Sequence, residues 1–216
     1  SKRKYISIKR LPQLGFNKNY FDEVMTSGEL IWQNLYNKSD DFFKKLGRRC
    51  YYLVDATKDD AKKYIEGLQY EFVKNIESAD FILACTITPG LRTLDYVPIL
   101  EKAIEKKLPF ICANPDYESI ESLTNNLTIC MGTISELYKD LGGVVCIKGK
   151  PSIDIYKEAT KKFKKIDKKR MLAIGDSIHH DIQGAINFGI DSLLIVSGIH
   201  KSGFDQSLPK WDDNNN

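Results

Sequence analysis

The stretch Met171-Leu-Ala-Ile-Gly175-Asp176-Ser177-Ile-His-His-Asp181 decides how the chain is interpreted. Its first four apolar residues predict a buried strand, and Gly175 lets the chain turn sharply off the strand end. In open α/β sheets, reactive residues lie at the carboxyl ends of the strands. Asp176 at the tip and Asp181 in the next helix would offer Mg²⁺ two oxygen ligands. Alternatively, Asp176 shapes the turn and Asp181 caps the helix.

A second predicted strand end carries a cation. Val144-Val-Cys-Ile147 predicts a strand, and Lys148-Gly149-Lys150-Pro151 follows it, with Pro151 suited to the first turn of a helix. Lys150 could neutralise a phosphate or a carboxylate there, although a lysine in a solvated loop is the alternative. Because one helix separates Lys150 from Asp176, we expect the two residues to end adjacent parallel strands at the same edge.

Short apolar strands alternate with amphipathic helices along most of the chain. This alternation predicts an α/β fold with a parallel sheet that is covered on both faces. Strands are predicted at 23–26, 51–54, 80–85, 110–113, 126–130, 144–147, 171–174 and 192–196, with Ser27 as a helix N-cap. Helices are predicted at 1–15, 28–46, 59–68, 94–107, 134–141, 153–163 and 181–188.

The composition excludes some classes of partner. The net charge is +3, with 32 basic and 29 acidic residues spread along the chain, which gives no electrostatic case for nucleic acid. The lysine-rich stretch 157–170 is interpreted as the solvated face of a helix. No apolar run approaches the roughly 20 residues that span a bilayer. Five scattered cysteines, flanked by aliphatic residues, indicate buried thiols in a reducing cytoplasm.

Gly149-Lys150-Pro151, followed by Gly175-Asp176 and Asp181, closely resembles the third and fourth motifs of the haloacid dehalogenase (HAD) superfamily. Three further features look like its class IIA branch, which includes sugar-phosphate, nucleotide and pyridoxal-phosphate phosphatases. They are Thr26-Ser27, Cys112-Ala-Asn-Pro-Asp116 and Leu141-Gly-Gly143. The resemblance implies a Rossmann-like parallel-sheet core, N-terminally incomplete, with an inserted α/β class II cap domain. Residues 1–24 would be a core remnant, 25–143 the cap and 144–216 the C-terminal part of the core.

The resemblance also implies roles for single residues. The family activity would be a Mg²⁺-dependent phosphohydrolase acting on a small phosphorylated metabolite. Lys150 would orient the nucleophile and the phosphate, Asp176 would bind Mg²⁺, and Asp181 would lie beside the metal or bond to Lys150. Asn114 and Asp116 are candidates for substrate contact, with an ordinary Asx/Pro turn as the alternative.

Two histidines lie close to these carboxylates in the sequence. We interpret His179 and His180 as an outward-facing turn rather than metal ligands, since Mg²⁺ favours oxygen donors.

The motif that carries the family's nucleophile, Asp-x-Asp-Gly, occurs nowhere in the 216 residues. Ser1-Lys-Arg-Lys4 resembles the helix opening that follows motif two, so the chain is expected to start just past that motif. Two hypotheses follow: a phosphomonoesterase in the complete protein, or a catalytically incompetent chain that retains phosphate, metal or partner binding. A plain nucleotide-binding module lacks support, because neither Gly-x-Gly-x-x-Gly nor Gly-x-x-x-x-Gly-Lys-Ser/Thr is present. The resemblance also implies a homodimer.

Overall fold

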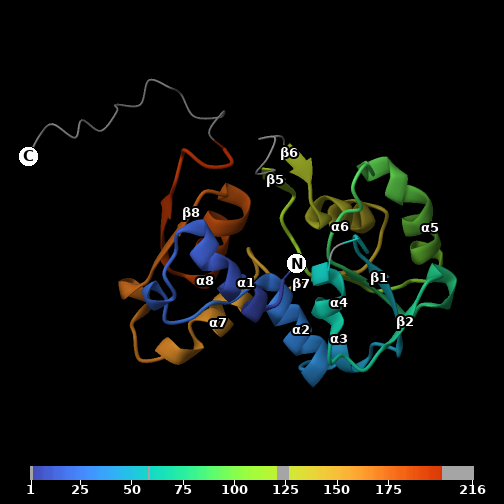
Figure 1. The fold of residues 1–216 in the computed structure, drawn as a ribbon, viewed down its shortest axis with the longest axis horizontal. Coiled ribbons are helices and arrows are strands. Elements are labelled where there is room, and N and C mark those ends of the chain that lie inside the picture. Colours follow the sequence, from blue (N-terminus) through green and yellow to red (C-terminus); the bar gives the residue numbers. More distant parts are fainter. Residues whose placement is uncertain (1, 58, 121–126, 201–216) are drawn as a thin grey trace, which may run out of the picture.

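The computed structural model describes residues 2–57, 59–120 and 127–200, which form two α/β units joined near the N-terminus (Figure 1). The predicted α/β class is confirmed. The larger part, which we call the five-stranded unit, is built on one parallel sheet, and the smaller part, the two-stranded unit, on another.

The sheet of the five-stranded unit has the order β2-β1-β3-β4-β7, and every pair of neighbours is parallel. β2 is a short edge strand that the sequence analysis missed. A separate antiparallel hairpin, β5 with β6, leaves the carboxyl end of this sheet (Figure 1). The strands are β1 (Arg49–Leu53), β2 (Glu71–Val73), β3 (Phe81–Ala84), β4 (Phe110–Cys112), β5 (Glu118–Ile120), β6 (Leu127–Ile129) and β7 (Val145–Ile147).

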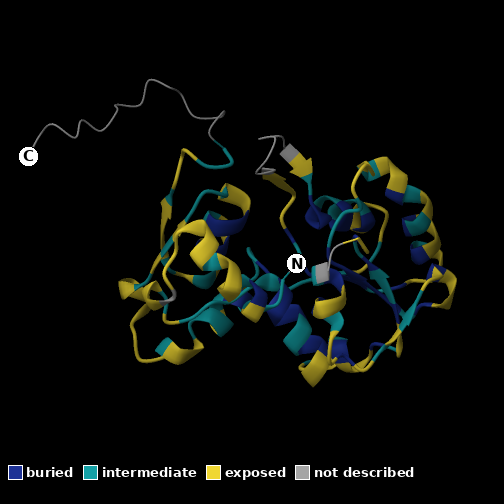
Figure 2. Cartoon of the chain, viewed as in Figure 1, coloured by how far each residue is buried: buried dark blue, intermediate teal, exposed yellow. Residues whose placement is uncertain are grey.

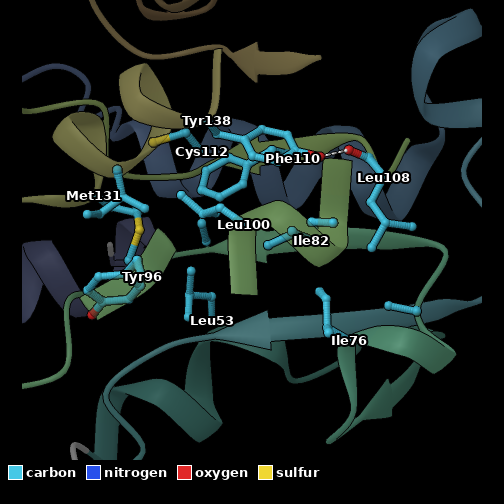
Figure 3. Close-up of a cluster of buried hydrophobic side chains, with 14 residues drawn as sticks. Leu53, Ile76, Ile82, Tyr96, Leu100, Leu108, Phe110, Cys112, Met131 and Tyr138 are labelled. Atoms are coloured by element: carbon cyan, nitrogen blue, oxygen red, sulfur yellow. Dashed lines mark hydrogen bonds between the residues drawn. The ribbon is translucent and has the colours of Figure 1, made fainter. Parts of the chain in front are cut away.

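Helices cover both faces of the five-stranded sheet, and the inner strands β3 and β4 are apolar and buried at every position. Successive side chains of a strand point to opposite faces, so Ile82 and Phe110 pack into one hydrophobic cluster and Phe81 and Ile111 into the other. Figure 3 shows the first cluster, where Tyr138 donates a hydrogen bond to the carbonyl of Leu108. The helices are α2 (Ser27–Asn37), α3 (Asp41–Lys44), α4 (Asp59–Ile65), α5 (Val97–Glu105) and α6 (Met131–Asp140).

The two-stranded unit contains one parallel strand pair and the helices around it. Its surface differs from that of the larger sheet, since both strands are largely exposed (Figure 2). Apolar side chains account for much of this exposure: Leu172 is 55% exposed and Ile174 is 63% exposed. Its elements are α1 (Lys4–Arg10), α7 (Ile153–Ala159), β8 (Leu172–Gly175), the π-helical turn η7 (Ile178–Ile182), α8 (Gln183–Phe188) and β9 (Asp191–Leu194).

The predicted adjacency of the strands before Lys150 and Asp176 is wrong. β7 pairs with β4, in the register Phe110 to Val145, and β8 pairs with β9. β7 therefore closes the five-stranded sheet, and the chain crosses into the other unit after it. A short apolar strand shows that it is buried but not which neighbour buries it. The predicted domain boundary between residues 143 and 144 stays a prediction. Because β7 belongs to the five-stranded sheet, we propose that this boundary lies after Ile147.

The chain passes between the units at two places that touch each other. A Cβ on Gly149 would lie 2.7 Å from Cβ of Ser27, so little space separates the crossings. Side chains bridge the junction around this point. Arg3 Nε donates to Glu29 Oε2 at 2.7 Å, and Lys148 Nζ lies 3.2 Å from Asp40 Oδ2. Lys148 Nζ also donates to Asp154 Oδ2 of α7 at 2.9 Å.

Two local predictions near the junction need correction. Residues 23–26 form no strand, and Thr26 rather than Ser27 caps α2, since its hydroxyl accepts from the Glu29 amide at 2.9 Å. Pro151 precedes the N-cap Ser152 of α7 instead of opening the helix. Across the described ranges, none of the helices combines the length and the apolar character that crossing a membrane requires.

Candidate active site

The turn after β8 is built around Asp181. Its Oδ2 accepts a hydrogen bond from the Ser177 amide at 3.1 Å, which folds the carboxylate back over the strand end. Gly175 makes this possible, because a Cβ at that position would overlap the carboxylate of Asp181. The π-helical turn begins after the N-cap Ser177. Asp181 is thus a buried side chain, 8% exposed as a residue, held against the tip of the strand.

Lys150 reaches this turn from the crossing at Gly149. Its Nζ lies 2.5 Å from Asp181 Oδ1, an ion pair that was one of the two alternatives the family resemblance implied for Asp181. The Asp181 side chain is 12% exposed and that of Lys150 is 44% exposed, so the lysine has its charged end at the rim. The two residues therefore meet although their preceding strands belong to different sheets.

Asp176 occupies the strand tip as predicted. Its Oδ2 accepts a hydrogen bond from the Ile199 amide at 3.1 Å, which ties the tip to the segment after β9. Gly198 lies so close that a Cβ there would overlap the Asp176 side chain. Both carboxylates of the predicted pair are hence fixed by backbone amides around one turn.

The loop 114–117 comes to the same place from the carboxyl end of β4. A Cβ on Gly149 would lie 2.7 Å from Cγ of Pro115, so this loop packs directly beside the Gly149-Lys150 segment. Ser27 donates a hydrogen bond to the carbonyl of Ala113, the residue just before this loop, at 3.0 Å. Asn114 is half-buried and Asp116 is exposed. The structure therefore places Pro115, which lies between the two candidate substrate contacts, beside the segment that carries Lys150.

The interpretation of His180 as an outward-facing residue is wrong, whereas His179 is exposed as expected. His180 is 7% exposed, and its ring nitrogens lie 3.1 Å from the Pro115 carbonyl and 2.9 Å from Ser177 Oγ. Sequence reasoning gave no signal for this contact, because Pro115 lies 65 residues away in the chain. It also missed the support that Ser27 gives the loop.

A cysteine nucleophile is not available beside this loop. Cys112 is buried at the end of β4, and its thiol donates to the Asn114 carbonyl at 3.2 Å. Burial raises the pKa of this thiol from 9.0 to about 12, so almost none of it is thiolate at neutral pH. All five cysteines carry free thiols. Cys146 is half-buried, and the other four are buried.

The donor set near the turn fits Mg²⁺ in part. Asp176 and Asp181 supply carboxylate oxygens, and Mg²⁺ commonly takes one or two carboxylates together with water and phosphate. However, the described part of the chain contains no group of three or more His, Cys, Asp or Glu side chains able to hold a metal ion. A complete site would need ligands from a phosphate, water or a further carboxylate.

Comparison with known proteins gives a consistent relationship. A family model described as HAD-hydrolase-like matches residues 147–213, which include Lys150, Asp176 and Asp181. No curated protein matches the chain. A haloacid dehalogenase-like hydrolase structure from Brucella suis 1330 is 28% identical, with a TM-score of 0.81, covering 94% of this chain and 75% of that one.

Two more distant structures share the fold. A p-nitrophenyl phosphatase from Archaeoglobus fulgidus is 18% identical with a TM-score of 0.63, over 95% of this chain and 77% of that chain. A glycerol phosphate phosphatase from Mycobacterium tuberculosis, solved in complex with magnesium, is 19% identical with a TM-score of 0.65, over 92% and 56% of the two chains. The match over residues 147–213 and the 28% identical structure make this chain similar to haloacid dehalogenase-like hydrolases, and the two phosphatase structures share its fold.

Proposed function

We propose that this chain supplies the phosphate-binding and metal-binding half of a Mg²⁺-dependent phosphomonoesterase that acts on a small phosphorylated metabolite. The observation that carries the proposal is the Lys150–Asp181 pair at the tip that also bears Asp176. A cation beside two carboxylates can bind phosphoryl oxygens while a metal offsets the remaining negative charge. The phosphatases among the similar structures support the same reaction class.

The residues divide this work between them. Asp176 and Asp181 would hold Mg²⁺, which supplies Lewis-acid stabilisation of phosphoryl oxygens when bound. Lys150 would orient the phosphoryl group, and its pairing with Asp181 keeps the ammonium at the rim without substrate. Asn114 and Asp116 would contact the leaving group, because their loop lies beside Lys150.

The reaction needs a nucleophile that the 216 residues do not contain in the family's motif. We propose that an aspartate reaches the phosphoryl group from a strand beside β8, whose other neighbour is β9. Its attack would form an aspartyl phosphate and release the alcohol, and water would then hydrolyse the acyl phosphate. The second function is a catalytically incompetent chain that binds phosphate, metal or a partner. The absence of Asp-x-Asp-Gly favours it for the chain alone.

A side-by-side assay separates these functions. We expect the 216-residue chain to hydrolyse p-nitrophenyl phosphate with Mg²⁺ no faster than background. The same chain with an upstream Asp-x-Asp-Gly segment should turn over, and Asp176→Ala should abolish that turnover. Background rates from both proteins would contradict the phosphatase proposal. Turnover by the chain alone, lost in Asp176→Ala, would contradict the need for an added nucleophile.

We expect the loop 114–117 to determine which phosphate esters the enzyme prefers. In the complete enzyme, Asp116→Ala should change relative kcat/KM values across a panel of phosphate esters and leave Mg²⁺ affinity unaltered. Asp95→Ala removes another exposed carboxylate from the five-stranded unit, and we expect that control to change neither. Unchanged preference in Asp116→Ala would remove this residue from the substrate site. The reduced thiols support a cytoplasmic location, which we propose on that basis.

A further inference from the structure

His180 links the two units at the candidate site. It lies in the π-helical turn of the two-stranded unit, and its ring contacts the loop 114–117 of the five-stranded unit. The ring centroid of Tyr117 is 5.1 Å from that of His180, so the loop adds an aromatic contact. The residue is 7% exposed and is therefore shielded from water at the junction.

The hydrogen bonds define the orientation of this ring. The Pro115 carbonyl can only accept, so Nε2 of His180 carries a proton and donates it over 3.1 Å. Nδ1 of the same ring lies 2.9 Å from the Ser177 hydroxyl oxygen, which can donate to it. The Ser177 oxygen in turn lies 3.3 Å from the backbone N–H of His180, from which it accepts. Each donor in this small network has an acceptor, and the ring is held on both edges.

The loop is attached on its other side to the start of α6. The Gly132 amide donates to the Asp116 carbonyl at 3.0 Å, and the Cys130 amide donates to the Tyr117 carbonyl at 2.7 Å. Gly132 is required for this approach, because its Cβ would overlap the carbonyl of Pro115. The loop is thus clamped between its own unit and His180.

We propose that His180 is a positioning residue, which holds the loop of Asn114 and Asp116 against the turn of Asp176 and Asp181. This role rests on the proposed function for its purpose, but the contact can be tested without turnover. A buried polar ring is costly unless it is paired. Here the pairing of Nε2 lies entirely across the junction, where it fixes the substrate side of the site relative to its phosphate side.

Amide hydrogen exchange of the 216-residue chain tests the proposal. The amides of Cys130 and Gly132 report on the loop, because their acceptors are loop carbonyls. In His180→Ala we expect both amides to exchange about tenfold faster, since one hydrogen bond restrains the loop less. The amides of β1 and β3 should keep their wild-type rates. His180→Gln retains an N–H that can reach the Pro115 carbonyl, and it should restore slow exchange.

His179→Ala is the matched control, because His179 is the exposed neighbour in the same turn. It should leave Cys130 and Gly132 at wild-type rates. Three results would overturn the proposal: unchanged exchange in His180→Ala, an equal acceleration throughout the chain, or exchange in His180→Gln as fast as in His180→Ala. Should His180→Ala fail to fold, the comparison of His180→Gln with His180→Leu decides in the same way. A failure of the phosphatase assay would leave these exchange results standing, because no catalysis enters them.

Discussion

Single charges at the junction have the clearest consequences at the residue scale. Glu23 forms ion pairs with Lys4 and Lys162. These pairs connect the segment before α2 to α1 and to the stretch after α7. These hydrogen bonds, that of Lys162 first, lower the pKa of the carboxyl from 4.5 to about 2. A carboxyl with a depressed pKa stabilises the fold above its unfolded value and loses that contribution as the pH falls through the folded value.

Glu23→Gln should therefore flatten the fall in stability between about pH 4.5 and pH 2. At pH 7 we expect a loss of at most about 1 kcal/mol, because Lys162 is exposed and its charge is screened by solvent. Urea unfolding at a series of pH values measures both effects. Glu136→Gln, which breaks an exposed pair with Lys139, is the control at pH 7 and should not change the midpoint. An undiminished acid slope in Glu23→Gln would contradict the assignment.

Gly175 provides a second test at the residue scale. Gly175→Ala places a methyl group on the Asp181 carboxylate, so we expect a destabilisation of about 1–3 kcal/mol from overpacking. The same substitution in an Asp181→Ala background should cost much less, because its collision partner is gone. Chemical denaturation of the four proteins in this cycle gives the coupling energy. Equal costs in both backgrounds would show that Asp181 does not occupy the strand tip.

Prediction of these residues from sequence succeeded where the chemistry is local. Asp176 and Asp181 follow the same strand and lie in the same turn, so their short separation in the sequence predicts that they are close. Lys150 contacts Asp181, which was one of the two alternatives that the family resemblance implied, although the predicted adjacency of their strands was wrong. His180 could not be found, because its partner is a backbone carbonyl and a carbonyl has no sequence signature.

At the scale of elements, the five-stranded sheet carries most of the buried apolar surface. Runs such as Phe81-Ile-Leu-Ala84 predicted its strands, because continuous apolar residues suit a sheet with two covered faces. β2 escaped prediction, since Glu71-Phe-Val73 is only three residues long and begins with an exposed charge at the sheet edge. Pairing order depends on contacts between distant segments, which explains why β7 was assigned to the wrong neighbour.

The central position of Phe110 makes it the test of this sheet. Phe110 is fully buried and stacks with Tyr138 at 5.2 Å between ring centroids. Phe110→Ala should cost about 3–5 kcal/mol by removing apolar surface and leaving a cavity. Leu94→Ala, at a residue 73% exposed, should change the free energy of unfolding by less than about 0.5 kcal/mol. Similar losses in both variants would argue against the described core.

At the scale of the whole molecule, β8 and β9 present apolar side chains to solvent. Ile174 and Leu193 are paired in register, lie on one face and are 63% and 48% exposed. Within the described ranges β8 has β9 as its only strand partner. Such an edge with an apolar face favours pairing with another chain.

We therefore predict that the 216-residue chain self-associates through this edge. Ile174→Lys should shift the dissociation constant upward by about tenfold or more, because it places a charge on the apolar face. Leu14→Lys is the control: Leu14 is 62% exposed but lies in the turn after α1. Sedimentation velocity over a range of concentrations measures both. A monomeric wild-type chain at all concentrations, or equal effects of the two substitutions, would contradict the prediction.

The two crossings lie close together at Ser27 and Gly149, and this proximity decides how far the backbone limits rotation of one unit relative to the other. Two crossings set well apart would restrict the units to rotation about the line that joins the crossings. Crossings that meet at one point define no axis, so the backbone leaves all three rotational directions open. The direction of any closing movement is then selected by side chains around the pivot, Arg3 with Glu29 and Lys148 with Asp40. Residual dipolar couplings should accordingly show that Lys148→Met changes the direction of inter-unit rotation, and not merely its amplitude.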